Sequence, residues 1–112
     1  MNYGLMEHVK KNGGATLSKS LEHAEVNGYM VSLKGFEKIL KISEVEKIQK
    51  DIEEKQKVIT KNNQYIGLWL DNDDLYIDIS ENISDETTAI NTGRLNEQIA
   101  IYDCNNKKVI EC

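Results

Sequence analysis

Acidic and amide side chains crowd around a tryptophan and a tyrosine in the stretch GLWLDNDDLYIDIS, residues Gly67–Ser80. Carboxylates at this density can coordinate a metal ion, serve as acid and base in catalysis, or form the charged rim of a protein-binding surface. The same residue types also favour a tight turn, because Asp and Asn tolerate left-handed backbone angles and bond their own backbone. Each alternative makes a different demand on the neighbouring sequence.

The calcium pattern is not met. A calcium loop needs oxygen ligands at alternating positions, a glycine at the sixth position and a glutamate at the twelfth. Counted from Asp71, the residues at the fifth, sixth and twelfth positions are Leu75, Tyr76 and Asn82. Acid and base catalysis lacks support too, because acids in a solvated turn have nothing to raise a pKa. We predict a turn, with no metal, no cofactor and no catalytic residue.

The histidines and cysteines show no zinc pattern. His8, His23, Cys104 and Cys112 lack the short paired spacing that builds a tetrahedral site. We predict that both histidines are structural or on the surface. A bridge between the cysteines would close only a small loop and stabilise little, so we predict free thiols.

Alternating apolar residues on both sides of DNDD predict a hairpin with one aliphatic and one aromatic face. In the favoured register Trp69 lies opposite Tyr76, and Gly67 lies opposite Asp78. The aromatic face is either covered as core or open as a binding surface. A third hypothesis places a small pocket at Asp78, where Gly67 leaves space. The predicted protein-binding residues are Tyr65, Trp69, Asp71, Asp73, Asp74, Tyr76, Asp78 and Tyr102, the last because Ile99 and Ile101 should point to the aliphatic side.

Caps and periodicity predict the remaining elements. A short helix fits residues 1–11, and two extended segments fit residues 15–33, with a turn at Asn27–Gly28. Ser43 should cap a helix that ends near Asn62, with Glu46 completing a capping box. Ser84 should cap a second one that ends near Gly93. Strands are expected at residues 98–103 and 108–112.

The resulting order is approximately ββαββαββ, with two main helices. We predict one α+β domain over residues 1–112, a mostly antiparallel sheet with its helices on one face. The absence of a long apolar run predicts no membrane span and a cytoplasmic location.

The charge is distributed unevenly along the chain. Residues 1–64 carry eleven lysines against nine acids, a net charge of +2, whereas residues 65–112 carry three bases against ten acids, a net charge of −7. An acidic half repels a phosphate backbone and attracts basic protein surfaces. We therefore predict no direct nucleic-acid binding and a protein partner with a basic surface. Homo-oligomerisation is left open.

Several motifs resemble those of small proteins from phages and other mobile elements, which belong to no named family and have no assigned catalytic residues. The similar features are a Gly-x-Trp hairpin, a Tyr-x-Asp-x-Ser strand, a helix that opens with an acid, an Asn-x-Gln-x-Ala-Ile-x-Asp strand, and the segments NGGAT and GYMVSLKG. Their positions here are Gly67, Trp69, Tyr76, Asp78, Ser80, Asp85, Asn96, Gln98, Ala100, Ile101 and Asp103.

The resemblance implies an origin rather than an activity. It favours a non-enzymatic module that binds a host protein. One alternative is an anti-CRISPR-like inhibitor of a nucleic-acid-cutting defence enzyme, in which carboxylates replace phosphates. The other is a small enzyme or ligand-binding protein with a pocket at Asp78.

Overall fold

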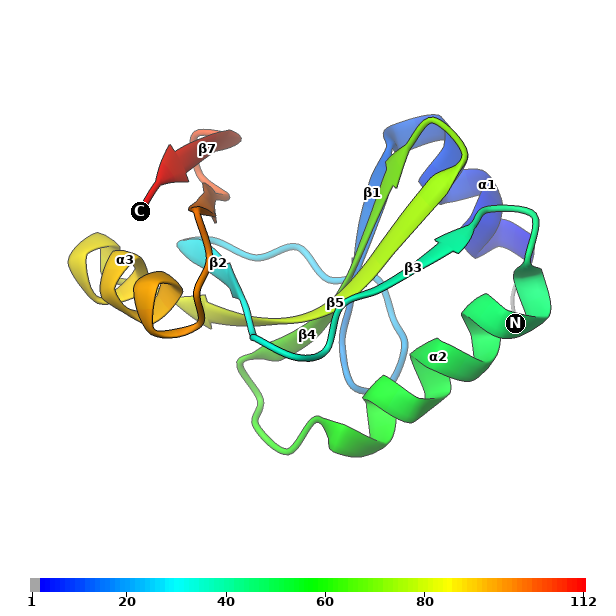
Figure 1. Cartoon of the computed structure of the whole chain (residues 1–112), viewed down its shortest axis with the longest axis horizontal. Helices are drawn as coiled ribbons and strands as arrows, with labels where there is room; N and C mark the ends of the chain where they lie inside the picture. Colours follow the sequence, from blue (N-terminus) through cyan, green and yellow to red (C-terminus); the bar gives the residue numbers. More distant parts are fainter. Residues whose placement is uncertain (1–2) are drawn as a thin grey trace.

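Within residues 3–112, the part that the computed structural model describes, seven strands form one antiparallel sheet and three helices pack on it (Figure 1). The elements are α1 (Tyr3–Asn12), β1 (Gly14–Leu17), β2 (Tyr29–Ser32), β3 (Lys38–Lys41), α2 (Val45–Val58), β4 (Gln64–Asp71), β5 (Asp74–Ile83), α3 (Glu86–Leu95), β6 (Ala100–Asp103) and β7 (Lys108–Glu111). The α+β prediction is confirmed. The predicted order lacked strand β3 and counted only two main helices.

Strand β5 is the axis of the sheet. The strands follow the order β1-β4-β5-β2-β6-β7, and β3 pairs with β5 outside this path. On one edge of β5, therefore, two short strands share its length: β3 pairs with residues 74–77 and β2 with residues 80–83. The long β4–β5 hairpin occupies the other edge. The sheet consequently has two ends, which bend away from each other in Figure 1.

The hairpin forms in the predicted register. Trp69 lies opposite Tyr76 and Gly67 opposite Asp78. The turn places Asn72 at a φ of 54°, a left-handed angle that asparagine adopts at low cost. The DNDD segment therefore serves a tight turn, as its composition indicates.

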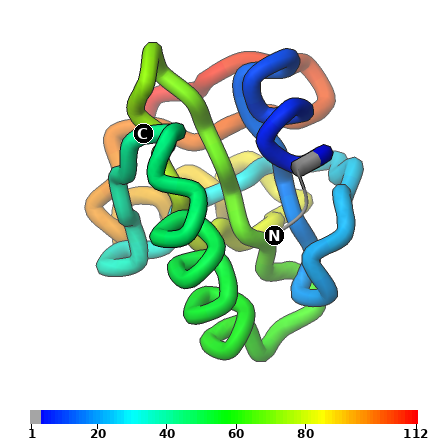
Figure 2. The backbone as a smooth tube through the Cα atoms, turned by 90° about the vertical axis from the view of Figure 1, so that its right-hand side faces the viewer, coloured from blue at the N-terminus to red at the C-terminus, as the bar shows by residue number. Residues whose placement is uncertain are grey.

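All three helices pack on the same side of the sheet, which we call the covered face. Alternate strand residues share a face, so Ile77 and Ile79 of β5 lie on the same side as Val31 of β2, whose partner in β5 is Glu81. Helices α1 and α2 pack on Ile77 and Ile79, and α3 packs on Val31. Figure 2 shows α1 and α2 nearest the viewer, with most of the sheet behind them. We call the opposite side the open face.

The buried apolar residues divide into two cores. The larger one lies between α1, α2 and the strands β1, β4 and β5, a region that we call the hairpin end; its buried residues are Leu5, Met6, Val9, Leu17, Ile48, Ile52, Ile59, Ile66, Leu68, Leu75, Ile77 and Ile79. The smaller one lies between α3 and the strands β2 and β6, a region that we call the α3 end; its buried residues are Val31, Ala89 and Ile101.

Both predicted helix caps are wrong by one residue. Helix α2 has Glu44 at its N-cap position, not Ser43, and the Glu44 carboxylate accepts from the Lys41 backbone N–H instead of a helix N–H. Helix α3 is capped by Asp85, not Ser84: its carboxylate accepts from both the backbone N–H and the hydroxyl of Thr88. A carboxylate also interacts favourably with the helix dipole, which explains its advantage over a serine hydroxyl.

The two N-terminal extended segments do not pair with each other. Strand β1 pairs with β4, whereas β2 pairs with β5 and β6. The intervening residues 18–28 leave the sheet. No helix in the described residues has the length and apolar character needed to cross a membrane.

Candidate protein-binding face

The open face exposes several large side chains. Trp69 of β4 is 64% exposed and Ile39 of β3 is 50% exposed. Across the sheet, Tyr102 of β6 is 41% exposed and Val109 of β7 is 66% exposed. The strand registers place all four on the side opposite to Ile77. The aromatic face of the hairpin is thus open and forms no core.

Trp69 and Tyr76 form the centre of an apolar row. Their ring centroids are 5.8 Å apart with an interplanar angle of 40°, a tilted contact of the type that aromatic pairs prefer. Ile39 lies opposite Tyr76 on one side. On the other side Gly14 lies opposite Trp69 and adds no side chain, because a Cβ there would come within 2.5 Å of the Leu68 carbonyl oxygen. The indole is therefore flanked on β1 by a bare backbone.

Asp78 follows in the next row and is held by two hydroxyls. Ser32 donates its hydroxyl to Oδ2 at 2.7 Å, and Ser80 donates its hydroxyl to Oδ1 at 3.1 Å. Burial raises the pKa of Asp78, while the hydroxyl bonds from Ser32 and Ser80 and the charge of Lys55 oppose that rise. The carboxylate is thus partly buried and satisfied by neighbours within the sheet.

The space predicted above Gly67 is already filled. A Cβ placed on Gly67 would lie 2.5 Å from Oδ1 of Asp78, so the carboxylate itself lies over the glycine. Gly67 is required there because any larger residue would displace Asp78. Both serine hydroxyls point their protons at the carboxylate, which makes them donors to Asp78 rather than nucleophiles activated by it. The geometric basis for a pocket at this position is therefore wrong.

The acids of the turn are exposed at the tip of the hairpin. Asp71 and Asp73 are exposed, and Asp74 forms an ion pair of 2.7 Å with Lys41 on β3. The main-chain oxygen of Asp73 accepts from the backbone N–H of Ile42. Across residues 3–112 no three His, Cys, Asp or Glu side chains are grouped to hold a metal ion. The tip is a negatively charged rim beside the Trp69–Tyr76 pair.

The other two predicted tyrosines lie away from this pair. Tyr65 lies opposite Ser80, two rows from Trp69. Tyr102 shares the open face but stands on β6, three strands from β4, where it pairs with Met30 and Val109. The prediction that Ile99 points to the aliphatic side is wrong, since it precedes β6 and is 89% exposed.

Sequence reasoning missed Ser32, Ile39 and Val109 on this face. Ser32 could have been found, because it is out of phase with Val31 in a predicted strand. Ile39 could not, because β3 is four residues long and the run KILKI fits a helix as well as a strand.

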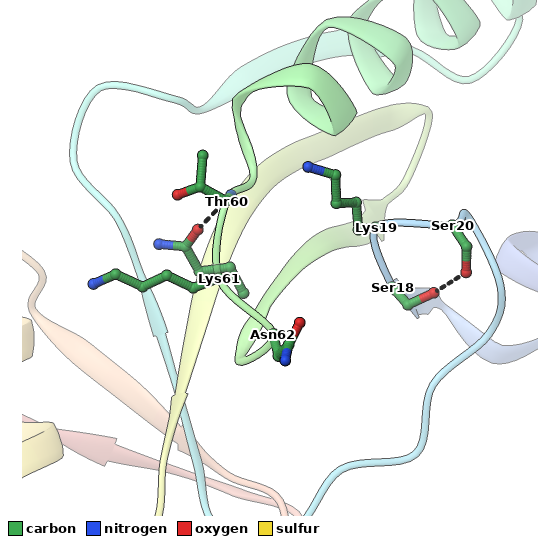
Figure 3. Close-up of a pocket in the computed structure, with 7 residues that line it drawn as sticks. Ser18, Lys19, Ser20, Thr60, Lys61 and Asn62 are labelled. Atoms are coloured by element: carbon green, nitrogen blue, oxygen red, sulfur yellow. Dashed lines mark hydrogen bonds between the residues drawn. The ribbon is translucent and has the colours of Figure 1, made fainter.

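A polar cavity of about 370 Å³ lies elsewhere, beside the end of α2 (Figure 3). Lys19 donates to the backbone carbonyl of Ile59, and Ser18 and Ser20 share a hydrogen bond of 2.9 Å. Lys61 extends away from Lys19 (Figure 3). The lysines do not converge on a common point, so the cavity has no assembled anion site.

Comparison of the chain with protein-family models, with curated protein sequences and with solved structures gives no match.

Proposed function

We propose that the chain is a protein-binding module whose open face engages a basic surface on a host protein. The observation that carries this proposal is the exposure of Trp69 beside Tyr76 on a sheet face that no helix covers. Tryptophan and tyrosine dominate binding hot spots because they bury a large area with little loss of conformational entropy.

Charge complementarity supports a basic partner. The acids Asp71 and Asp73 border the aromatic pair, and no base of the described residues forms an ion pair with either. Six of the thirteen lysines lie on α1 and α2, on the opposite side of the sheet, and Lys41 of β3 is paired with Asp74 at the hairpin tip. The molecule therefore presents its acids and its exposed aromatic pair together, and its helical lysines elsewhere. A groove that normally holds DNA or RNA is one such basic surface, so inhibition of a nucleic-acid-cutting enzyme is a narrower form of this proposal.

Trp69 makes the proposal directly measurable, because it is the only tryptophan in the chain. Retention of host proteins on the immobilised chain should be compared for the wild type, Trp69→Ala and Val58→Ala. Val58 is an exposed apolar residue of α2 on the opposite side and serves as the matched control. The expected partner is retained by the wild type and by Val58→Ala, lost by Trp69→Ala, and released as salt rises.

The isolated partner should then be titrated into the wild-type chain. Burial of the indole should shift its fluorescence to shorter wavelength, and Asp71→Asn/Asp73→Asn should slow association at low salt. An unchanged emission spectrum on a confirmed complex, or equal loss of the partner in Val58→Ala, would contradict the proposed face. Displacement by duplex DNA or RNA would identify the narrower form.

A further inference from the structure

The two histidines of the chain meet in the folded protein. His8 lies on α1 and His23 lies in the segment after β1, fifteen positions later, yet their ring centroids are only 4.3 Å apart with an interplanar angle of 44°. Sequence spacing gives no sign of this pair. Neither the hairpin nor the open face involves it.

Ordered backbone holds both rings. His8 belongs to a helix, and its carbonyl accepts from the Asn12 side chain. His23 forms a bridge with Leu17, and the hydrogen bonds from Ser18 N–H to Glu22 and from Ala24 N–H to Thr16 flank this bridge. The ring positions are thus fixed by two separate segments. His23 is exposed and His8 is half-buried, so solvent reaches the pair.

His23 also lines a cavity of about 280 Å³ between α1 and α2. Leucine and isoleucine side chains form most of its wall, and Gln49 and Glu53 supply the polar part. The Glu53 carboxylate places a negative charge on the same wall as His23. A negative charge there favours a cation over an anion.

We propose that His8 and His23 together bind a divalent first-row transition ion that prefers nitrogen ligands at a right angle, of which Ni²⁺ and Cu²⁺ are examples. Metal–imidazole bonds are about 2.0–2.1 Å long, so rings this close can direct nitrogens at one ion only at an angle of about 90°. That angle suits octahedral or square-planar coordination better than the tetrahedral geometry of zinc. Residues 3–112 contain no group of three His, Cys, Asp or Glu ligands, so water fills the remaining positions.

Ni²⁺ is the appropriate probe because Cu²⁺ would oxidise the free thiols of Cys104 and Cys112. The untagged chain should be melted with and without Ni²⁺, with Mg²⁺ as the control ion. A ligand bound only by the native state raises the Tm, and about 1 mM Ni²⁺ should raise it by at least about 3 °C. The rise should disappear in His8→Gln and in His23→Gln, and persist in Asp71→Asn/Asp73→Asn.

A second measurement does not depend on how the variants fold. Paramagnetic Ni²⁺ at substoichiometric amounts should broaden the imidazole NMR signals of His8 and His23 before any others. Zn²⁺ should raise the Tm less than Ni²⁺ at equal concentration. A Tm rise that survives in both histidine variants, first broadening at the hairpin acids or the cysteines, or a larger effect of Zn²⁺ would overturn the proposal.

Discussion

The two ends of the sheet are held in different ways. The hairpin end encloses a core of twelve buried apolar residues between two helices and three strands, whereas the α3 end encloses three. Buried apolar area is the main source of folding free energy, so most of the stability should lie at the hairpin end. The comparison shows how one continuous sheet can combine a firmly packed part and a weakly packed part.

Polar contacts partly compensate at the α3 end. Asp85 caps α3, and Asp103 accepts from the backbone N–H groups of Asn105 and Asn106 in the β6–β7 turn. Leu95 and Ile99, in contrast, are 83% and 89% exposed and add nothing to the core. Segments with few buried apolar contacts open at lower free energy than the rest of a domain. We expect α3, β6 and β7 to exchange amide hydrogens before the β4–β5 hairpin does.

The largest expected effects come from truncation of each core. Ile77→Ala at the hairpin end should cost about 3–5 kcal/mol, since Ile77 is fully buried among large neighbours that cannot collapse into the cavity. Ile101→Ala at the α3 end should cost about 2–3 kcal/mol, because a smaller and more open core relaxes more easily. Urea unfolding of both variants measures the difference. Equal costs would show that the α3 end is as tightly packed as the hairpin end.

A pair of glycines gives the next largest effect. A Cβ on Gly67 would lie 2.5 Å from Asp78 Oδ1, and one on Gly93 would lie 2.7 Å from Cys112 Sγ and 2.9 Å from Ile101 Cγ2. Gly67→Ala should cost about 1–3 kcal/mol, as overpacking typically does. Gly93→Ala should cost less, because alanine regains about 1 kcal/mol of helix propensity in α3.

A double-mutant cycle tests the cause at Gly67. In an Asp78→Ala background the clash is absent, and Gly67→Ala should become neutral or stabilising, because alanine loses less backbone entropy than glycine. An undiminished cost in that background would mean that the carboxylate is not what excludes a side chain from position 67.

Local pattern was sufficient to predict the hairpin, because alternation fixes which residues share a face. The register of Trp69 with Tyr76 and of Gly67 with Asp78 followed from placing the turn at DNDD, since the position of the turn sets the register of a hairpin. The capping residues were less certain, since Ser43 and Ser84 each precede a carboxylate that competes for the same position.

Contacts between distant segments could not be predicted. The Ser32 hydroxyl on Asp78 spans 46 positions, and the contact of His8 with His23 depends on how residues 18–28 leave the sheet. The first contact follows from the pairing of β2 with β5 and the second from the path of residues 18–28, and periodicity encodes neither. The exposure of Trp69 could not be predicted for the same reason, because it depends on all three helices packing on the other face of the sheet.

The pH dependence of stability should have opposite sign at two acids. Burial raises the pKa of Asp78 above its ordinary value of 3.8. The stabilisation that Asp78 provides is therefore present below pH 3.8 and is lost as the pH rises through the higher folded pKa. The hydrogen bond from the Asn106 side chain, and after it those from backbone N–H groups, lower the pKa of Asp103. The stabilisation that Asp103 provides is therefore present above pH 3.8 and is lost as the pH falls through the lower folded pKa.

Melting curves of the wild type, Asp78→Asn and Asp103→Asn between about pH 2 and pH 7 separate the two contributions. The advantage of the wild type over Asp78→Asn should shrink as the pH rises above 3.8, and its advantage over Asp103→Asn should shrink as the pH falls below it. Parallel curves for the two variants would show that folding shifts the pKa values of both acids in the same direction, at the centre of the sheet and at the α3 end.

The smallest expected effect is at the two turns. Asp71 and Asp73 at the hairpin tip are exposed, and within residues 3–112 their carboxylates form no ion pair. The carboxylate of Asp103, in contrast, organises the β6–β7 turn. Asp71→Asn/Asp73→Asn should therefore change the free energy of unfolding by no more than roughly 0.5 kcal/mol, and Asp103→Asn should cost more. Urea unfolding at neutral pH compares the two, with and without Ca²⁺. A large loss at the hairpin tip, or a Ca²⁺-dependent rise in Tm that the double variant abolishes, would mean that the tip acids bind an ion and stabilise the turn in a way that their exposure does not explain.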